Sequence, residues 1–197
     1  MYERIIKRII DVILSACGLI VLGLPMLFVI FFIKIDDPGP AIFKQKRVGK
    51  NKEIFELYKF RSMKLNTPDI PTHLLENPNQ YLLRTGEFIR KFSIDELPQM
   101  VNILKGDMSI IGPRPALWNQ EDLITERDKY GANTVKPGLT GWAQINGRDE
   151  LEIPIKAKFD GEYVENLSFK FDCKCFFGTI AKVFSHEGVV EGGTKGK

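Results

Sequence analysis

The chain has 197 residues, a formal net charge of +3 and 27% charged residues, a composition typical of one folded domain and not of a disordered or strongly basic chain. Its three cysteines are an odd number without the spacing of a disulfide framework, which indicates free thiols in a reducing compartment. The two histidines, His73 and His186, are isolated in the sequence, which argues against a histidine-based triad or zinc site.

The first predicted element is an apolar run of 22 residues without a charge, from Val12 to Ile33. A straight helix of this length would measure about 33 Å, enough to cross the hydrocarbon core of a bilayer. Pro25 removes one helical hydrogen bond, so a break or kink is predicted there. Positive charges lie on both sides of the run: Arg4, Lys7 and Arg8 precede it, and the basic segment Lys44–Lys64 follows it. Two topologies therefore stay open: a single span, and a helix-break-helix that enters and leaves on the same face.

A basic segment follows the apolar run. A solvated face is the ordinary explanation for most of its charges, although so dense a cluster also fits an anionic partner such as phosphate, nucleic acid or an anionic lipid surface. Residues 41–60 contain two short apolar stretches around Gly49-Lys50-Asn51-Lys52, which predicts a β-hairpin. The basic residues are Lys44, Lys46, Arg47, Lys50, Lys52, Lys59, Arg61 and Lys64, against Glu53 and Glu56.

The rest of the chain alternates between short helical patterns and loops. We read Cys173 and Cys175 as packing residues near a helix, because side chains two apart point to different sides and no second ligand pair exists. In the helix predicted at 171–184, core packing is the first interpretation of the aromatic face, and contact with a bilayer is the second. The predicted elements are a surface loop over 66–80, helices over 81–91, 97–104, 117–130, 155–163 and 171–184, a rigid turn at 112–115, a loop with short extended pieces over 135–148, and a flexible tail.

Two adjacent carboxylates, Asp95 and Glu96, precede Pro98 and a predicted helix. The apolar stripe of that helix ends near Gly106 and consists of Leu97, Met100, Val101 and Leu104. The sequence from Ser93 to Glu96 fits a capping box, but Pro98 would then lie too deep in the helix, so Asp95 is the better predicted N-cap. From this stretch alone a helix cap is favoured over a catalytic role. A cap would keep Asp95 ionised, and an ionised carboxylate is also a nucleophile toward phosphorus, while its neighbour could hold a divalent cation.

Several cationic side chains elsewhere in the chain make a catalytic role for Asp95 and Glu96 more plausible than the stretch alone suggests. Arg114 stands between Pro113 and Pro115, which stiffen its backbone and help to aim the guanidinium. Taken singly, each of these cations is more typical of a surface charge. Together they offer positive charge for a diphosphate, and they are Lys59, Arg61, Arg90, Arg114 and Arg148.

Three segments, "YKFRSM", "FSIDELPQMVNILKGDMSIIGPRP" and "VKPGLTGWAQINGR", together resemble the bacterial sugar transferase family, the monotopic phosphoglycosyl transferases. The resemblance runs from Arg4 to about Val183, and the length matches the smallest members. It implies transfer of a sugar phosphate from a UDP-sugar to a polyprenol phosphate, usually undecaprenyl phosphate, with release of UMP. The product would enter glycoconjugate or polysaccharide biosynthesis.

The resemblance also implies site residues. Asp95 would be the nucleophile that forms a covalent phosphosugar intermediate in a ping-pong mechanism, and Glu96 would help to hold Mg²⁺ together with Asp95. Basic motif residues would bind phosphate, and a second set would help to form the donor pocket. The first set is Lys59, Arg61, Arg90, Arg114 and Arg148, and the second is Thr140, Gly141, Trp142, Gln144 and Asn146.

The implied architecture is a mainly helical α/β fold. Residues 1–36 would form a re-entrant membrane helix-break-helix, residues 37–185 a compact cytoplasmic catalytic domain with a small β-hairpin and amphipathic surface helices, and residues 186–197 a flexible tail. The chain would be monotopic, on the cytoplasmic face of the bacterial inner membrane, with the UDP-sugar, undecaprenyl phosphate and the inner leaflet as partners and no nucleic acid. A homodimer is allowed. The family break usually has a serine before proline, and here Leu24 stands in that place.

Two alternatives remain on the sequence. A membrane-anchored binding module without catalysis would explain the apolar run and the basic segment, but not the carboxylate pair or the glycine-rich loop. An inactive relative, or one with another acceptor, would keep the same motifs. The sequence does not specify the sugar.

Overall fold

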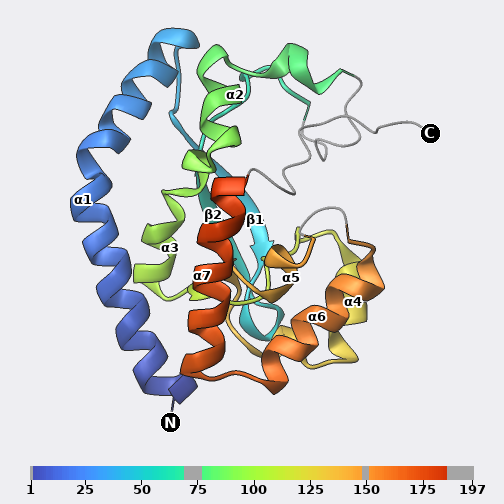
Figure 1. The fold of residues 1–197 in the computed structure, drawn as a ribbon. Coiled ribbons are helices and arrows are strands. Elements are labelled where there is room, and N and C mark those ends of the chain that lie inside the picture. The colour runs from blue at the N-terminus through green and yellow to red at the C-terminus, as the bar shows by residue number, and fades with distance from the viewer. Residues whose placement is uncertain (1, 69–76, 148–150, 186–197) are drawn as a thin grey trace.

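Helices make up most of the chain in the computed structural model, and two small two-stranded sheets lie between them (Figure 1). The structure describes residues 2–68, 77–147 and 151–185. This is the mainly helical α/β fold that the sequence predicts, while the predicted tail at 186–197 lies outside the described residues. The elements are α1 (Lys7–Asp36), β1 (Ile42–Val48), β2 (Ile54–Phe60), α2 (Arg84–Lys91), α3 (Gln99–Lys105), β3 (Ser109–Ile111), α4 (Glu121–Asp128), β4 (Gly138–Thr140), α5 (Trp142–Ile145), α6 (Ile153–Glu165) and α7 (Phe169–Ser185).

Helix α1 runs along one side of the molecule as a single continuous helix of 30 residues that passes through Pro25. Figure 1 shows the two halves of α1 inclined to one another, which fits the predicted kink. The predicted break at Pro25 is absent, because the residues on both sides of it stay helical. Packing on both sides of the proline accounts for this. Gly18 lies so close to α3 that a Cβ there would meet the Met100 sulfur at 2.8 Å, and Ile33 is fully buried farther along.

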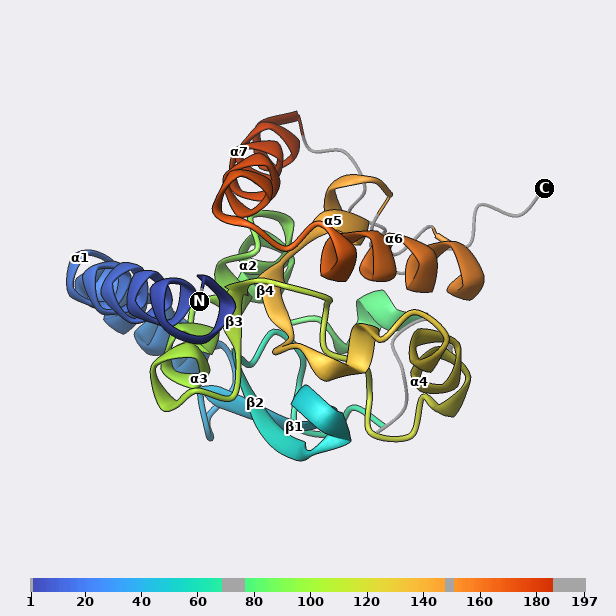
Figure 2. The same ribbon diagram turned by 90° about the horizontal axis from the view of Figure 1, so that it is seen from below.

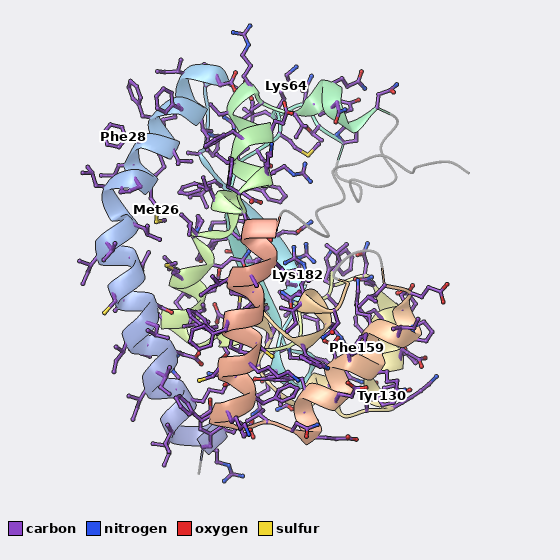
Figure 3. The ribbon with its side chains drawn as sticks, viewed as in Figure 1. Met26, Phe28, Lys64, Tyr130, Phe159 and Lys182 are labelled. Atoms are coloured by element: carbon purple, nitrogen blue, oxygen red, sulfur yellow. The ribbon has the colours of Figure 1, made fainter. Side chains whose placement is uncertain are left out.

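The face of α1 that contacts the rest of the protein is polar in its first half. Lys7, Asp11 and Ser15 are buried at intervals of four residues, which places them on one face of the helix. In the second half, Met26 points toward the domain and Phe28 points away from it (Figure 3). The outward face is an exposed apolar stripe along nearly the whole helix, and α1 is long and apolar enough to cross a membrane.

Both ends of α1 are fixed to the same globular body. At the start, the Lys7 ammonium lies 2.6 Å from Asp172 of α7, and the Asp11 carboxylate accepts a hydrogen bond from the Ile110 N–H of β3. At the end, the Asp36 carboxylate accepts the Thr85 N–H at 3.0 Å, which fixes the helix to α2. Figure 2 shows α1 on one flank of the molecule, with α3 beside it.

The predicted β-hairpin is confirmed: β1 and β2 pair antiparallel from Ile42 opposite Phe60 to Val48 opposite Ile54. Its β2 strand packs on α3, where the fully buried Leu57 and Ile103 share a core cluster with Met108. Farther along, β3 and β4 form a short parallel pair. Helix α3 packs against α1 and β2, and Ile110 of β3 and Leu139 of β4 pack on the cluster that holds Ile103 of α3.

Helices α6 and α7 lie where helices were predicted. Cys175 is fully buried against Ile111 and Tyr163, so the packing role expected for it is confirmed. The expectation that the aromatic face of α7 fills the core is wrong for Phe176, Phe177 and Ile180, which are exposed. The buried face of α7 is instead partly polar, because Asp172 faces inward.

We expect Asp172→Ala to destabilise the fold strongly. The Asp172 carboxylate accepts from Lys7 and from the hydroxyls of Tyr2 and Tyr163, so its removal leaves a buried ammonium without its counter-ion. Breaking one side of a buried pair costs about 3–5 kcal/mol. For a domain of this size this corresponds to a fall in Tm of roughly 6–20 °C, measured by thermal unfolding in detergent. Lys44→Ala, which removes the exposed pair with Glu56, should leave Tm nearly unchanged. Equal Tm values for the two variants would contradict this.

Candidate active site

The two adjacent carboxylates lie in a 3-10 turn, Ile94–Glu96, between α2 and α3. The prediction that Asp95 caps the following helix is wrong, because α3 begins after Pro98 and neither Pro98 nor Ser93 makes a side-chain cap hydrogen bond. Main-chain carbonyls take up the amides instead: Ser93 O accepts from Glu96 N at 3.2 Å, and Ile94 O accepts from Leu97 N at 3.1 Å. The carboxylates of Asp95 and Glu96 therefore serve other contacts.

Glu96 binds two cations from distant parts of the chain. Its Oε1 lies 2.9 Å from Lys59 Nζ of β2 and 2.8 Å from Arg114 Nη2, which follows β3. The Glu96 side chain is only 9% exposed. A buried carboxylate is costly unless it is paired and hydrogen-bonded, so this contact joins the hairpin, the turn and the segment after β3.

Asp95 is also largely buried, and Lys59 Nζ lies 4.0 Å from its Oδ2. Burial raises the pKa of Asp95 to about 6; the charge of Lys59 opposes this rise, the neighbouring Glu96 adds to it, and Arg90 and Arg114 oppose it. The ionisation of Asp95 is therefore not set by a helix end, as the sequence predicted, but by burial and the surrounding charges. Perturbed pKa values of buried groups are common at catalytic sites.

Lys59 is held in place by a residue that the sequence analysis did not single out. Asn102 of α3 is fully buried. Its Oδ1 accepts the Tyr58 N–H at 2.9 Å, and its Nδ2 donates to Glu56 O at 2.7 Å. These bonds fix the outer edge of β2 to the helix that follows the carboxylate pair. Asn102 stands between Val101 and Ile103 in a predicted helix, and this was the available signal.

Lys59 and Arg114 form ion pairs with the carboxylate pair, and the charge of Arg90 lowers the pKa of Asp95, whereas Arg61 pairs with another carboxylate. The Arg61 guanidinium is buried and lies 2.9 Å from Asp37, just after α1. This contact holds the end of α1. The phosphate binding predicted for Arg61 stays a prediction. Arg148 lies outside the described residues.

The predicted donor-pocket residues are engaged in the fold itself. Thr140 Oγ1 lies 2.6 Å from Thr179 Oγ1, and Asn146 Nδ2 donates to Trp142 O. The Trp142 indole donates to Glu162 at 2.9 Å and lies under the Lys174 ammonium. At Gly141, a Cβ would lie 2.0 Å from Gly112 O, so two segments can touch there only without a side chain.

Gln144 differs from its neighbours. Its Nε2 donates to Leu139 O at 3.0 Å, whereas its Oε1 is buried with no hydrogen-bond partner among the described residues. The side chains of this loop are thus bonded and packed within the fold, and their part in donor binding stays a prediction.

Comparison with known proteins gives a consistent result. The family model described as bacterial sugar transferase matches residues 2–186. A protein of Bacillus subtilis (strain 168) called an uncharacterized sugar transferase, EpsL, is 42% identical over 185 residues, which cover 94% of this chain and 90% of that protein.

Two similar proteins carry names that state a reaction. The UDP-glucose:undecaprenyl-phosphate glucose-1-phosphate transferase of Escherichia coli (strain K12) is 39% identical over 92% of this chain and 41% of its own length. A UDP-N-acetylgalactosamine-undecaprenyl-phosphate N-acetylgalactosaminephosphotransferase of Aeromonas hydrophila is 36% identical over 93% of this chain and 44% of its own length. The chain thus spans less than half of these two proteins. The match over nearly the whole chain, together with the carboxylate pair and its cations, shows that this chain belongs to the bacterial sugar transferase family.

Proposed function

We propose that this protein transfers a sugar 1-phosphate from a UDP-sugar to undecaprenyl phosphate and releases UMP. The observation that carries the proposal is the buried Asp95–Glu96 pair with Lys59 and Arg114 on Glu96 at 2.9 and 2.8 Å. Cations that surround a carboxylate pair can bind a diphosphate next to a nucleophile. The names of the Escherichia coli and Aeromonas hydrophila relatives support the same reaction class.

In the proposed first step, a carboxylate oxygen of Asp95 attacks the phosphorus that bears the sugar. The bond from that phosphorus to the UMP oxygen breaks, and UMP leaves with the electron pair. In the second step, an oxygen of undecaprenyl phosphate attacks the same phosphorus and Asp95 leaves as a carboxylate. Lys59, Arg90 and Arg114 stabilise the phosphate charge in both steps, and the structure supports this role by placing them at the pair.

Mg²⁺ suits this site as an ion that arrives with the substrate. Mg²⁺ is commonly held by one or two carboxylates plus substrate phosphates. Among residues 2–68, 77–147 and 151–185, no third potential ligand side chain joins Asp95 and Glu96. The two carboxylates would hold the ion with the diphosphate, where it would neutralise charge on the phosphate oxygens.

The proposed location is the cytoplasmic face of the inner membrane, with α1 inserted from one side. Two observations support it: the outward face of α1 is apolar, and Lys7 and Asp36 fix both ends of the helix to one body. A helix that spanned the bilayer would have to separate its two ends across it. Contact along the body favours one-sided insertion over a span, even though the helix is not broken at Pro25.

The covalent step predicts a mass change. Incubation with Mg²⁺ and a pool of UDP-sugars, without undecaprenyl phosphate, should add one sugar-phosphate mass to the intact protein, and the added mass should identify the sugar. Asp95→Asn should give no adduct because the amide cannot form the acyl phosphate. Asp122→Asn, at an exposed carboxylate of α4, should react like the parent. An adduct on Asp95→Asn would exclude Asp95 as the nucleophile.

The rate of adduct formation should depend on pH through Asp95. Since its pKa is raised to about 6, the nucleophile is mostly protonated below that pH, and the rate at pH 5 should be roughly a tenth of the plateau. Lys59→Met removes a charge that lowers the Asp95 pKa, so the inflection should move to higher pH. The profile is measured by stopped reactions and mass spectrometry at fixed Mg²⁺. An inflection near pH 4, or a downward shift in Lys59→Met, would oppose this assignment.

The one-sided arrangement predicts the location of tags at the two ends of the chain. With an epitope tag at each end, both should resist external protease in intact spheroplasts, and both should be cut after lysis. A span would expose one tag and protect the other. The comparison is made by immunoblot, with a tagged periplasmic protein as the control for protease activity.

A further inference from the structure

The segment Pro113–Ala116, which carries Arg114, is bonded at four successive main-chain carbonyl groups. The donors come from three separate elements and include two arginine side chains. They are Gly138 N to Pro113 O at 2.8 Å, Arg127 Nη2 to Arg114 O at 2.9 Å, Arg47 Nη1 to Pro115 O at 3.0 Å and Val48 N to Ala116 O at 3.0 Å.

The donor to the Arg114 carbonyl is part of a buried ion pair. Arg127 of α4 is 4% exposed and Asp160 of α6 is 1% exposed. The Nε and Nη2 atoms of Arg127 lie 2.8 and 2.6 Å from Asp160 Oδ2. Nη2 therefore serves both Asp160 and the Arg114 carbonyl, so the carboxylate fixes the guanidinium that bonds the segment.

Stability alone does not explain why an ion pair occupies this place. Next to it, α4 and α6 contribute Leu123 and Ala157 to an apolar cluster that includes Ala116. Apolar residues of similar volume often replace a buried pair without loss of stability. The pair supplies what apolar residues cannot, a donor for the Arg114 carbonyl. With Pro113 and Pro115 limiting the backbone on either side, a fixed carbonyl also fixes the direction in which the Arg114 side chain leaves it.

We propose that Arg127, held by Asp160, is a positioning residue for Arg114, and through Arg114 for the Glu96 carboxylate. This inference rests on the proposed function, because it places the positioned guanidinium at the phosphosugar transfer site. Among the described residues, the Arg127 guanidinium bonds Asp160 and the Arg114 carbonyl, and not the carboxylate pair. Its effect on the reaction is therefore exerted through Arg114.

The test is the double variant Arg127→Met/Asp160→Leu, which removes the pair without leaving a lone buried charge. We expect Tm to change by only a few degrees and UMP release to fall about tenfold or more, since small displacements of a positioned group are costly. In an Arg114→Ala background the same double variant should change the rate less than twofold. A crystal structure of the variant should show that Arg114 has left Glu96. As a control, Lys52→Met removes an exposed ion pair with Asp128, which lies on α4 like Arg127, and it should leave the rate of UMP release unchanged.

Equal fold losses with and without Arg114 would overturn the proposal, as would an unchanged Arg114–Glu96 contact in the variant structure. If the Arg114→Ala protein has no measurable rate of UMP release, the Arg114–Glu96 contact in the crystal structure of the double variant decides between the two outcomes. If the double variant does not fold, Arg127→Lys takes its place, because it keeps a positive charge beside Asp160 and removes the guanidinium. If the parent protein releases no UMP with any donor, the proposed function fails, and the crystallographic contact still decides whether Arg127 positions Arg114.

Discussion

The contact on which the rest of the site depends is the double pairing of the buried Glu96. Neither of its cations is a sequence neighbour: Lys59 comes from the hairpin and Arg114 from the segment after β3. Removing water from a carboxylate is costly, so the fold must deliver both cations accurately. Two buried polar side chains do this through the main chain, Asn102 next to Lys59 and Arg127 at Arg114. The ion pairs of Glu96 with Lys59 and Arg114 thus fix the turn that carries Glu96, and with it the neighbouring Asp95.

Helix α1 is joined to the elements that hold the carboxylate pair. Arg8 of α1 donates to the Leu104 carbonyl at the end of α3, the helix that begins just after the carboxylate pair, and Gly18 allows close contact with Met100 on that helix. The position of α1 against α3 is therefore set by specific contacts. The inward face of α1 is polar in its first half and apolar in its second, so the helix packs on the body along its length while its outward face stays apolar.

Much of this could be predicted from sequence, since local patterns dictated it. Two short apolar stretches around Gly49 predicted the hairpin, and a helical stripe that ends near Gly106 predicted α3. The observed φ of +99° at Gly106 fits a glycine that ends a helix. The adjacent carboxylates were also found. The errors arose where contacts in the fold prevailed over sequence rules. Main-chain carbonyls of a 3-10 turn took the amides that Asp95 was expected to cap, and the helix continued through Pro25 without a break. The partners of Glu96 and Arg61 follow from no local pattern, because Lys59, Arg114 and Asp37 lie far away along the chain.

The Lys7–Asp172 contact also bears on the order in which the chain is made. Its partners are 165 positions apart, so the ammonium leaves the ribosome long before the carboxylate exists. During that interval the helix carries a basic group that no part of the chain already made can neutralise in this way. Docking of the helix face at Lys7 is therefore completed only after α7 has been made. A chain that stops before α7 retains an unmatched charge on its most apolar helix.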